Sequence, residues 1–333
     1  MEPKQNRIYA TFGGRNQASL PELSQALLAR QRIDWPQLQA GYDALATKLE
    51  RRLEAGDLTV VLQCNPQRIV STGADIDPGA IKARPCFLCP ANLPASQQAI
   101  LWQRQFLLLC NPFPIVDRHF TIAHREHRPQ LLHGTLPAFL KLARDFQPDY
   151  AVLYNGPQSG ASAPDHLHFQ ALPQTAIPAL NEGIKHITKV REEHGVSLSK
   201  KIDGARTALL LEGSDAEAII ALIRKLIRAM QRLESRLPIA PLPQTEPMVN
   251  LFCLYAEGSW RVFIFPRRQH RPAAYYKSGE DQILVSPGAV DMGGVLVLPR
   301  EADYNRLDAA SLMNIFQDVS LDEALIEEIV TAI

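Results

Sequence analysis

One segment limits what this chain can fold into more than any other, because it joins a loop of small residues to an alternating run. Residues 155–165 contain two glycines, two serines and two prolines, and residues 166–171 alternate polar and apolar side chains. In an extended strand, every second side chain lies on the same face. We therefore predict a strand that carries His166, His168 and Gln170 on one face and packs the apolar residues between them into a core.

Two imidazoles and an amide on one face, roughly 6–7 Å apart end to end, could bind one tetrahedral phosphate between them. Neutral imidazole is a good nucleophile toward phosphorus, Gln170 could donate its amide hydrogens to a phosphate oxygen, and backbone N–H groups of 158–162 could bind further oxygens. Only one of the two histidines can lie in line with the bond that breaks. The pattern favours two-step nucleotidyl or phosphoryl transfer. The alternative, a half-buried strand with incidental histidines, would leave several polar groups in need of buried partners.

Composition excludes several classes of protein. The chain has 333 residues, of which 46% are hydrophobic and 21% charged, as expected for a globular protein of about two domains. Lys plus Arg equals Asp plus Glu at 35 each, so no net charge favours nucleic acid or a membrane surface. The first residues do not have the pattern of a signal peptide, and no run approaches the roughly 20 apolar residues of a membrane helix. The five cysteines are too sparse for a disulfide framework. We predict a cytoplasmic protein.

Hydrophobic periodicity predicts an α+β organisation. Helices are expected at 19–32, from Trp35 until Gly56, at 135–147 and from about Asp215 to Leu237, with a polar loop over 173–206 and a proline-rich linker over 238–247. Strands are expected in two blocks, at 58–64, 105–110, 119–123 and 150–154, and then at 248–256, 259–266, 282–286 and 293–298. We predict three parts: a helical segment over 1–57, a catalytic half over 58–237 and a second half over 248–333.

A Cys-x-x-Cys pair at Cys86 and Cys89 has the spacing of a zinc knuckle but supplies only two ligands. Histidines would have to complete the site, and the candidates are His124, His127 and His166. Free thiols that pack a turn, or a redox pair, are the alternatives.

Two other motifs could contact a nucleotide. Asn111 and Phe113 follow a predicted strand in a turn and could contact a ribose or a base, although the same residues also suit a plain Asx turn. The basic run 267–271 could reach phosphates or could be a solvated strand end.

These motifs resemble a known superfamily. Residues 165–170, Asp-His-Leu-His-Phe-Gln, together with Asn155, Gly156 and Ser162, resemble the His-x-His-x-Gln signature of the histidine-triad branch that contains galactose-1-phosphate uridylyltransferase, diadenosine tetraphosphate phosphorylase and GDP-hexose phosphorylase. The stretches 263–266, 285–289, 294–300 and 318–321 are similar to the closing segments of GDP-hexose phosphorylases. The chain departs from the uridylyltransferase pattern in having leucine between the histidines and one extra residue after Ser162.

The resemblance implies a fold of two histidine-triad-like halves that share an antiparallel β half-barrel flanked by helices, with the second half inactive. It makes His168 the nucleotidylated nucleophile, with Gln170 and His166 as its catalytic partners. The residues implied to bind the nucleotide and its phosphate are Asn111, Phe113, Asn155, Gly156, Gln158, Ser159, Gly160 and Ser162. The implied structural zinc ligands are Cys86, Cys89, His127 and His166.

The resulting hypothesis is a phosphorylase-type nucleotidyltransferase that acts on a GDP-hexose-type nucleotide-sugar. The nucleotidyl group would pass through His168 to inorganic phosphate or a sugar phosphate. The alternatives are a dinucleoside polyphosphate phosphorylase or hydrolase, and a non-catalytic nucleotide-binding module. No nucleic-acid or membrane partner is expected, and the oligomeric state stays open, with a homodimer as one option.

Overall fold

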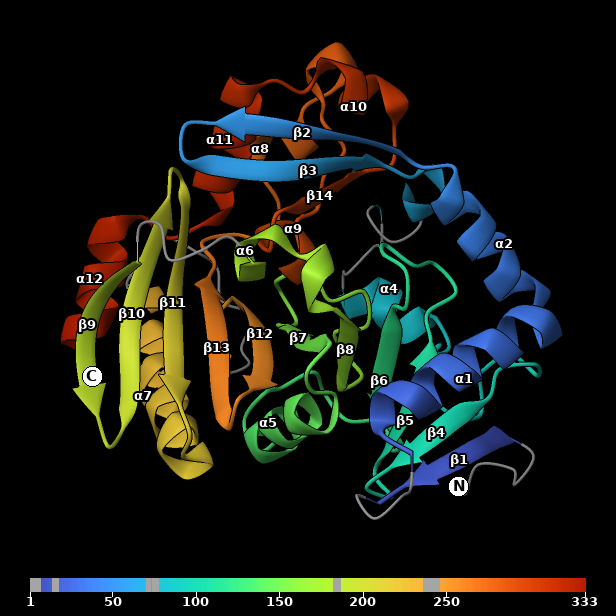
Figure 1. Cartoon of the computed structure of the whole chain (residues 1–333). Coiled ribbons are helices and arrows are strands. Elements are labelled where there is room, and N and C mark those ends of the chain that lie inside the picture. Colours follow the sequence, from blue (N-terminus) through green and yellow to red (C-terminus); the bar gives the residue numbers. More distant parts are fainter. Residues whose placement is uncertain (1–6, 14–17, 70–72, 74–77, 182–186, 236–245) are drawn as a thin grey trace.

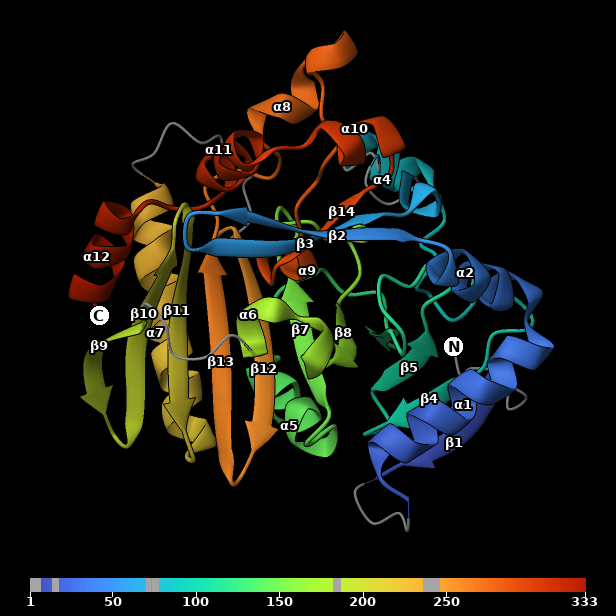
Figure 2. The ribbon, with the colours of Figure 1, turned by 45° about the horizontal axis from the view of Figure 1, so that its top comes forward.

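The computed structural model describes residues 7–13, 18–69, 73, 78–181, 187–235 and 246–333. Most strands form one eleven-stranded sheet in the order β1-β4-β5-β6-β8-β7-β12-β13-β11-β10-β9. Within this sheet, each strand runs antiparallel to its neighbours, except that β1 and β4 are parallel to each other. A small sheet of β14, β3 and β2 crosses one end of the large one, as Figures 1 and 2 show. The predicted α+β fold on a shared, largely antiparallel sheet is confirmed.

The large sheet is built from two runs of strands. The first is β1 (Ile8–Phe12), β4 (Ala99–Trp102), β5 (Phe106–Cys110), β6 (Phe120–His124), β7 (Tyr150–Asn155) and β8 (His168–Pro173). The second is β9 (Ile187–Glu193), β10 (Val196–Asp203), β11 (Arg206–Gly213), β12 (Val249–Ala256) and β13 (Ser259–Pro266). The small sheet contains β2 (Leu49–Ala55), β3 (Leu58–Cys64) and β14 (Val295–Leu298).

Helices cover both faces of the sheet. The longer ones are α1 (Leu20–Asp34), α2 (Pro36–Ala46), α5 (Leu136–Asp145), α7 (Ala216–Glu234), α11 (Ala309–Val319) and α12 (Glu323–Thr331). The short ones are α4 (Pro78–Ala83), α6 (Pro178–Asn181), α8 (Ala273–Tyr276), α9 (Ala289–Met292) and α10 (Glu301–Arg306), with single 3-10 turns at Pro66–Arg68, Gln174–Ala176 and Gly279–Asp281. No helix in the described part of the chain is long and apolar enough to cross a lipid bilayer.

Strand alternation divides the core into layers. On β8, Phe169 and Ala171 point into a large cluster formed with α1, α2, α5, α7 and α12. On β7, Leu153 points the other way, into a second cluster with the small sheet and α11. A third, smaller cluster near Cys86 lies over β5 and β6. The period-two pattern of the sequence therefore determines that His168 and Gln170 face away from the main core.

Three sequence expectations about elements are wrong. The helix expected from Trp35 to Gly56 ends at Ala46, because the chain then forms strand β2 and turns back at Gly56, which has φ +60°, into β3. The loop expected over 173–206 contains β9 and β10, which pair with each other. Residues 282–286 form no strand. Sequence periodicity missed the strands because hairpin pairing, which is a tertiary contact, stabilises polar strands at an edge.

The sheet order bears on how the chain divides. Strands β9 to β11 continue from β13 and not from β7 or β8, so residues 187–213 lie with the second run of strands. Most of the linker expected over 238–247, namely residues 238–245, lies outside the described residues. The division into a catalytic and an inactive half stays a prediction.

A buried guanidinium joins the second run of strands to the loops beyond it. Arg267, only 1% exposed, donates five hydrogen bonds, to Asn250 Oδ1 and to the carbonyls of Val319, Pro287, Gln269 and His270. The basic run that begins here is therefore not simply a solvated strand end.

We predict that Arg267→Met lowers the free energy of unfolding by about 3 kcal/mol or more, because several buried acceptors lose their donor. Urea denaturation followed by circular dichroism would measure this. The control is Arg268→Met, whose side chain is 51% exposed and should change stability by about 0.5 kcal/mol or less. Equal stabilities of the two variants would contradict the assignment.

Candidate active site

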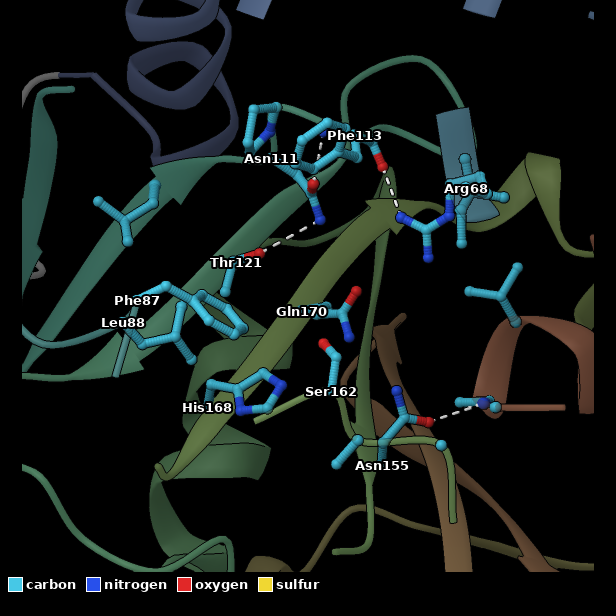
Figure 3. A pocket seen from close by; sticks show the side chains of 18 of the residues that line it. Arg68, Phe87, Leu88, Asn111, Phe113, Thr121, Asn155, Ser162, His168 and Gln170 are labelled. Atoms are coloured by element: carbon cyan, nitrogen blue, oxygen red, sulfur yellow. Dashed lines mark hydrogen bonds between the residues drawn. The ribbon is translucent and has the colours of Figure 1, made fainter. Parts of the chain in front are cut away.

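A cavity of about 580 Å³ lies on the face of the sheet that carries His168 and Gln170. Figure 3 shows these two side chains together with Ser162, Asn155 and Arg68 around one space. Its wall comes from strands β5 to β8 of the first run, from β14 of the small sheet, and from the segments near 84–97, 111–115, 160–162, 270–271 and 286–291. A cavity of this size suits a small organic ligand.

The structure divides the predicted residues into two groups. His168, Gln170, Asn155, Gly160, Ser162, Asn111 and Phe113 line the cavity. His166, Gly156, Gln158 and Ser159 do not. Because β8 begins at His168, the three polar residues do not share one face, and His166 turns instead toward Cys86 and Cys89. The expectation of three polar residues around one phosphate is wrong in this respect.

The loop residues outside the cavity serve the framework. Gly156 lies so close to β12 that an added Cβ would be 2.8 Å from the Val249 carbonyl oxygen. Gln158 and Ser159 use their carbonyl oxygens to accept hydrogen bonds from His270 and Asn250. Gly160 has φ +90°, and a Cβ there would be 2.6 Å from Gly288 Cα, so two loops meet at a point that only glycine fits.

Hydrogen bonds determine which nitrogen of His168 faces the cavity. Nδ1–H of His168 donates to the carbonyl oxygen of His166 at 2.8 Å, which leaves the Nε2 lone pair for the cavity. Burial is the main cause that lowers the pKa of His168 to about 4, so the ring is neutral at physiological pH. Buried Gln130 holds the backbone, since it accepts from His168 N and donates to the carbonyls of His168 and Asn155.

A second histidine, His119, orients Gln170. It is 1% exposed, and its Nδ1 accepts a hydrogen bond from Ile115 N at 3.3 Å. Its Nε2 therefore carries the hydrogen and donates to Gln170 Oε1 at 2.6 Å. The amide nitrogen of Gln170 is left for the cavity, where it can only donate.

The amide of Asn155 is oriented in the same way from the other side. Arg267 Nη1 donates to Asn250 Oδ1 at 2.6 Å, and Asn250 Nδ2 donates to Asn155 Oδ1 at 2.8 Å. Ala289 N donates to the same oxygen at 2.7 Å, as the dashed line in Figure 3 shows. The Asn155 amide nitrogen therefore remains as a donor beside that of Gln170.

Asn111 has both of the roles that its sequence allowed. Its Oδ1 accepts from Phe113 N at 2.9 Å, which is the Asx turn, and its Nδ2 contacts Thr121 Oγ1 at 3.4 Å. Arg68 donates to the Phe113 carbonyl and Arg84 donates to the Ser162 carbonyl, so two guanidiniums also border the cavity. Donors thus dominate its polar wall.

Sequence reasoning missed His119, Gln130, Arg68 and Arg84. His119 had a usable signal, because it alternates with Phe120 and Ile122 at the start of a predicted strand. The other three lie in turns and short helices. Only tertiary structure brings Arg68 and Arg84 to the cavity and Gln130 to the backbone of His168.

Cys86, Cys89, His127 and His166 form a cluster whose ligand atoms all lie within 4.8 Å of one another. The distances from Cys86 Sγ to His166 Nδ1, from Cys89 Sγ to His127 Nδ1 and from Cys89 Sγ to His166 Nδ1 are 3.3, 3.3 and 3.6 Å. Tetrahedral zinc with Zn–S near 2.3 Å and Zn–N near 2.0–2.1 Å requires roughly 3.5 Å between S and N. The residues therefore fit a tetrahedral metal ion.

The neighbours of the two histidines in the cluster favour tautomers that leave Nδ1 free to bind a metal. His166 Nε2–H donates to the His124 carbonyl at 2.7 Å, so Nδ1 keeps its lone pair toward the thiols. His127 Nε2 lies 3.7 Å from Asp165 Oδ2, a common partner of metal-bound histidine. His124, the other sequence candidate, lies outside the cluster and accepts from Glu126 N.

Comparisons with known proteins agree with this fold. Residues 27–173 match the model of a domain of unknown function, DUF4922, and residues 182–333 match the GDPGP1-like C-terminal domain. No curated protein matches the sequence significantly.

Among solved structures, yeast Ap4A phosphorylase Apa2 in complex with Ap4A is similar with a TM-score of 0.59 and 13% identity, over 91% of this chain and 99% of that one. The same yeast enzyme in complex with AMP gives a TM-score of 0.55 and 14% identity, over 90% and 96% of the two chains. These likenesses show that the chain shares the fold of this yeast enzyme. Together with the match of residues 182–333, they support the resemblance that the motifs of the sequence indicated.

We predict that His119 keeps one neutral tautomer, with hydrogen on Nε2, from pH 8 down to pH 5. Burial lowers the pKa of His119 to about 4, so protonation begins only below that window. Long-range proton–nitrogen NMR of ¹⁵N-histidine-labelled protein would report the tautomer, with the signal assigned by its loss in His119→Gln. Hydrogen on Nδ1, or protonation between pH 5 and 7, would contradict the geometry.

Proposed function

We propose that the protein is a phosphorylase-type nucleotidyltransferase that acts on a nucleotide-sugar of the GDP-hexose type. The observation that carries this proposal is the direction in which the groups around the cavity can form hydrogen bonds. One nucleophilic lone pair, His168 Nε2, faces a space into which Asn155 and Gln170 can only donate. Donors of fixed direction around one acceptor atom suit a bound phosphate that is attacked by nitrogen.

In the proposed first step, His168 Nε2 bonds to the α-phosphorus and the bond to the bridging oxygen breaks, with its electrons leaving on the sugar phosphate. In the second, an oxygen of inorganic phosphate bonds to the same phosphorus and the N–P bond breaks. The Gln170 and Asn155 amides would stabilise the negative charge that grows on the phosphate oxygens in both steps. Because these amides are oriented before substrate arrives, they need no reorganisation during the reaction.

Gln170 lies at the position where smaller histidine-triad hydrolases carry a third histidine, which favours transfer to phosphate over hydrolysis. A dinucleoside polyphosphate phosphorylase is the second candidate. It is supported by the fold shared with the yeast Ap4A phosphorylase over almost the whole chain. A non-catalytic binding module would have no need of the buried relay through His119 to Gln170.

The test is intact-mass spectrometry after incubation with GDP-hexoses, UDP-hexoses or Ap4A without phosphate. One substrate should add one nucleotidyl group to the protein, and phosphate should then remove it. His168→Asn should abolish the adduct, whereas His194→Asn, at a side chain 80% exposed, should keep it. Absence of an adduct across the panel, or turnover that survives His168→Asn, would refute the proposal.

We further propose that Cys86, Cys89, His127 and His166 bind a structural zinc ion. Bound zinc would stabilise this loop region by linking residues far apart in the chain. His166 would then link metal and nucleophile, because its ring lies in the cluster while its carbonyl fixes the tautomer of His168.

We expect about one zinc per chain by inductively coupled plasma mass spectrometry. Cys86→Ser and Cys89→Ser should each weaken metal binding at least about tenfold and lower the melting temperature. Cys253→Ala removes a buried thiol outside the cluster and should keep the metal. Full zinc content in both serine variants would exclude this site.

A further inference from the structure

Three polar side chains from the segment that follows the second run of strands line the same cavity as His168. His270 and Arg271 follow β13, and Ser286 precedes α9. The sequence had left it open whether the basic run 267–271 reaches phosphates. The structure divides that run, because Arg267 is buried in the framework, Arg268 is half exposed, and His270 and Arg271 reach the cavity.

The three side chains form one oriented hydrogen-bond chain. His270 Nδ1–H donates to the Gln158 carbonyl at 2.9 Å, which leaves Nε2 as an acceptor. Ser286 Oγ lies 3.3 Å from that Nε2 and donates to it, while its oxygen accepts from Arg271 Nε at 3.0 Å. The Arg271 guanidinium also lies over the Tyr275 ring, 4.2 Å from its centroid. Contacts on several sides thus fix the position of this cation.

The cluster adjoins the residues around His168. Ala289 N, in the same loop as Ser286, donates to Asn155 Oδ1, and Gly288 meets Gly160 at close contact. A phosphate bound by His168, Gln170 and Asn155 would therefore have the 286–289 loop as its neighbour. The next phosphate of a bound diphosphate could lie there.

Charge supports the same assignment. Among the described residues that line the cavity, the charged side chains other than histidine are Arg68, Arg84, Arg271 and Asp291. Both Asp291 oxygens accept from backbone, at Gly288 N and Val297 N. Arg68 and Arg84 come from the segment between β3 and β4, and Arg68 interacts electrostatically with Asp291. Arg271 is the cation that the segment after β13 contributes.

We propose that the Arg271 guanidinium, positioned by Ser286 and His270, forms the subsite for the second phosphate. This inference rests on the proposed function and deepens it. The phosphate of the departing sugar phosphate and the inorganic phosphate that accepts the nucleotidyl group are bonded in turn to the same α-phosphorus, opposite His168. One subsite therefore serves both half-reactions, and the run of strands without a His-x-His supplies it.

The test uses the full chain with Arg271→Gln and Ser286→Ala, and Arg268→Gln as the matched control. The nucleotidylated enzyme is isolated and its discharge is followed in water and in increasing phosphate. Arg271→Gln should raise the half-saturating phosphate concentration at least about tenfold, as expected for loss of a charge-assisted hydrogen bond. Ser286→Ala should raise it by a smaller factor. Discharge by water should stay within about twofold of the wild type in all three variants.

A second arm measures formation of the adduct from the nucleotide-sugar, where Arg271→Gln should slow the reaction by a similar factor. An unchanged half-saturating phosphate concentration in Arg271→Gln, or equal decreases in the rates of discharge by phosphate and by water, would overturn the subsite.

If the wild type forms no adduct at all, the proposed function fails and calorimetry with inorganic pyrophosphate decides the subsite separately. Binding at least about tenfold weaker in Arg271→Gln than in Arg268→Gln would support it, and equal binding would overturn it.

Discussion

The chemistry that the cavity can offer depends on one constraint. Some buried groups can only donate hydrogen bonds, and they fix the direction of every hydrogen bond that follows from them. A guanidinium cannot accept, so Arg267 turns the oxygen of Asn250 toward itself, and Asn250 then turns its nitrogen to Asn155. On the other side, the Ile115 N–H forces His119 to donate to Gln170. Both relays end in an amide nitrogen at the cavity. Reversing any member would leave two donors or two acceptors facing each other in a buried place, which is costly.

A third relay begins at the Cys86, Cys89, His127 and His166 cluster and orients His168, the proposed nucleophile. His166 donates through Nε2 to a carbonyl and presents Nδ1 to the thiols, while its own carbonyl receives the Nδ1 hydrogen of His168. The two histidines of the motif thus have different surroundings, although they are two residues apart. This separation follows from the start of β8 at His168, which leaves His166 in the preceding turn.

Particular residues show how far the sequence could predict this site. Alternation around Phe169 correctly placed His168 and Gln170 on the face opposite the main core, and the Cys-x-x-Cys spacing found the cluster that His127 and His166 complete. His166 was wrongly expected to share the face of His168, because a strand was assumed to begin at the first histidine. Strands β9 and β10 were missed because they are rich in polar residues and their stability comes from hairpin pairing, which the side-chain pattern does not show.

The sequence by itself determined the chemistry on offer: an imidazole and an amide on alternate positions, a glycine loop before them, and thiols at zinc spacing. These are local patterns, and side-chain period and residue type suffice to identify them. Only the tertiary structure decided whether each group offers a hydrogen or a lone pair to the cavity. It also decided that Arg271 and Ser286 line the same cavity as His168. Several of these decisions depend on partners far away in the sequence, such as Gln170 for His119 and Ala289 for Asn155. No local pattern encodes which distant donor a buried acceptor will meet.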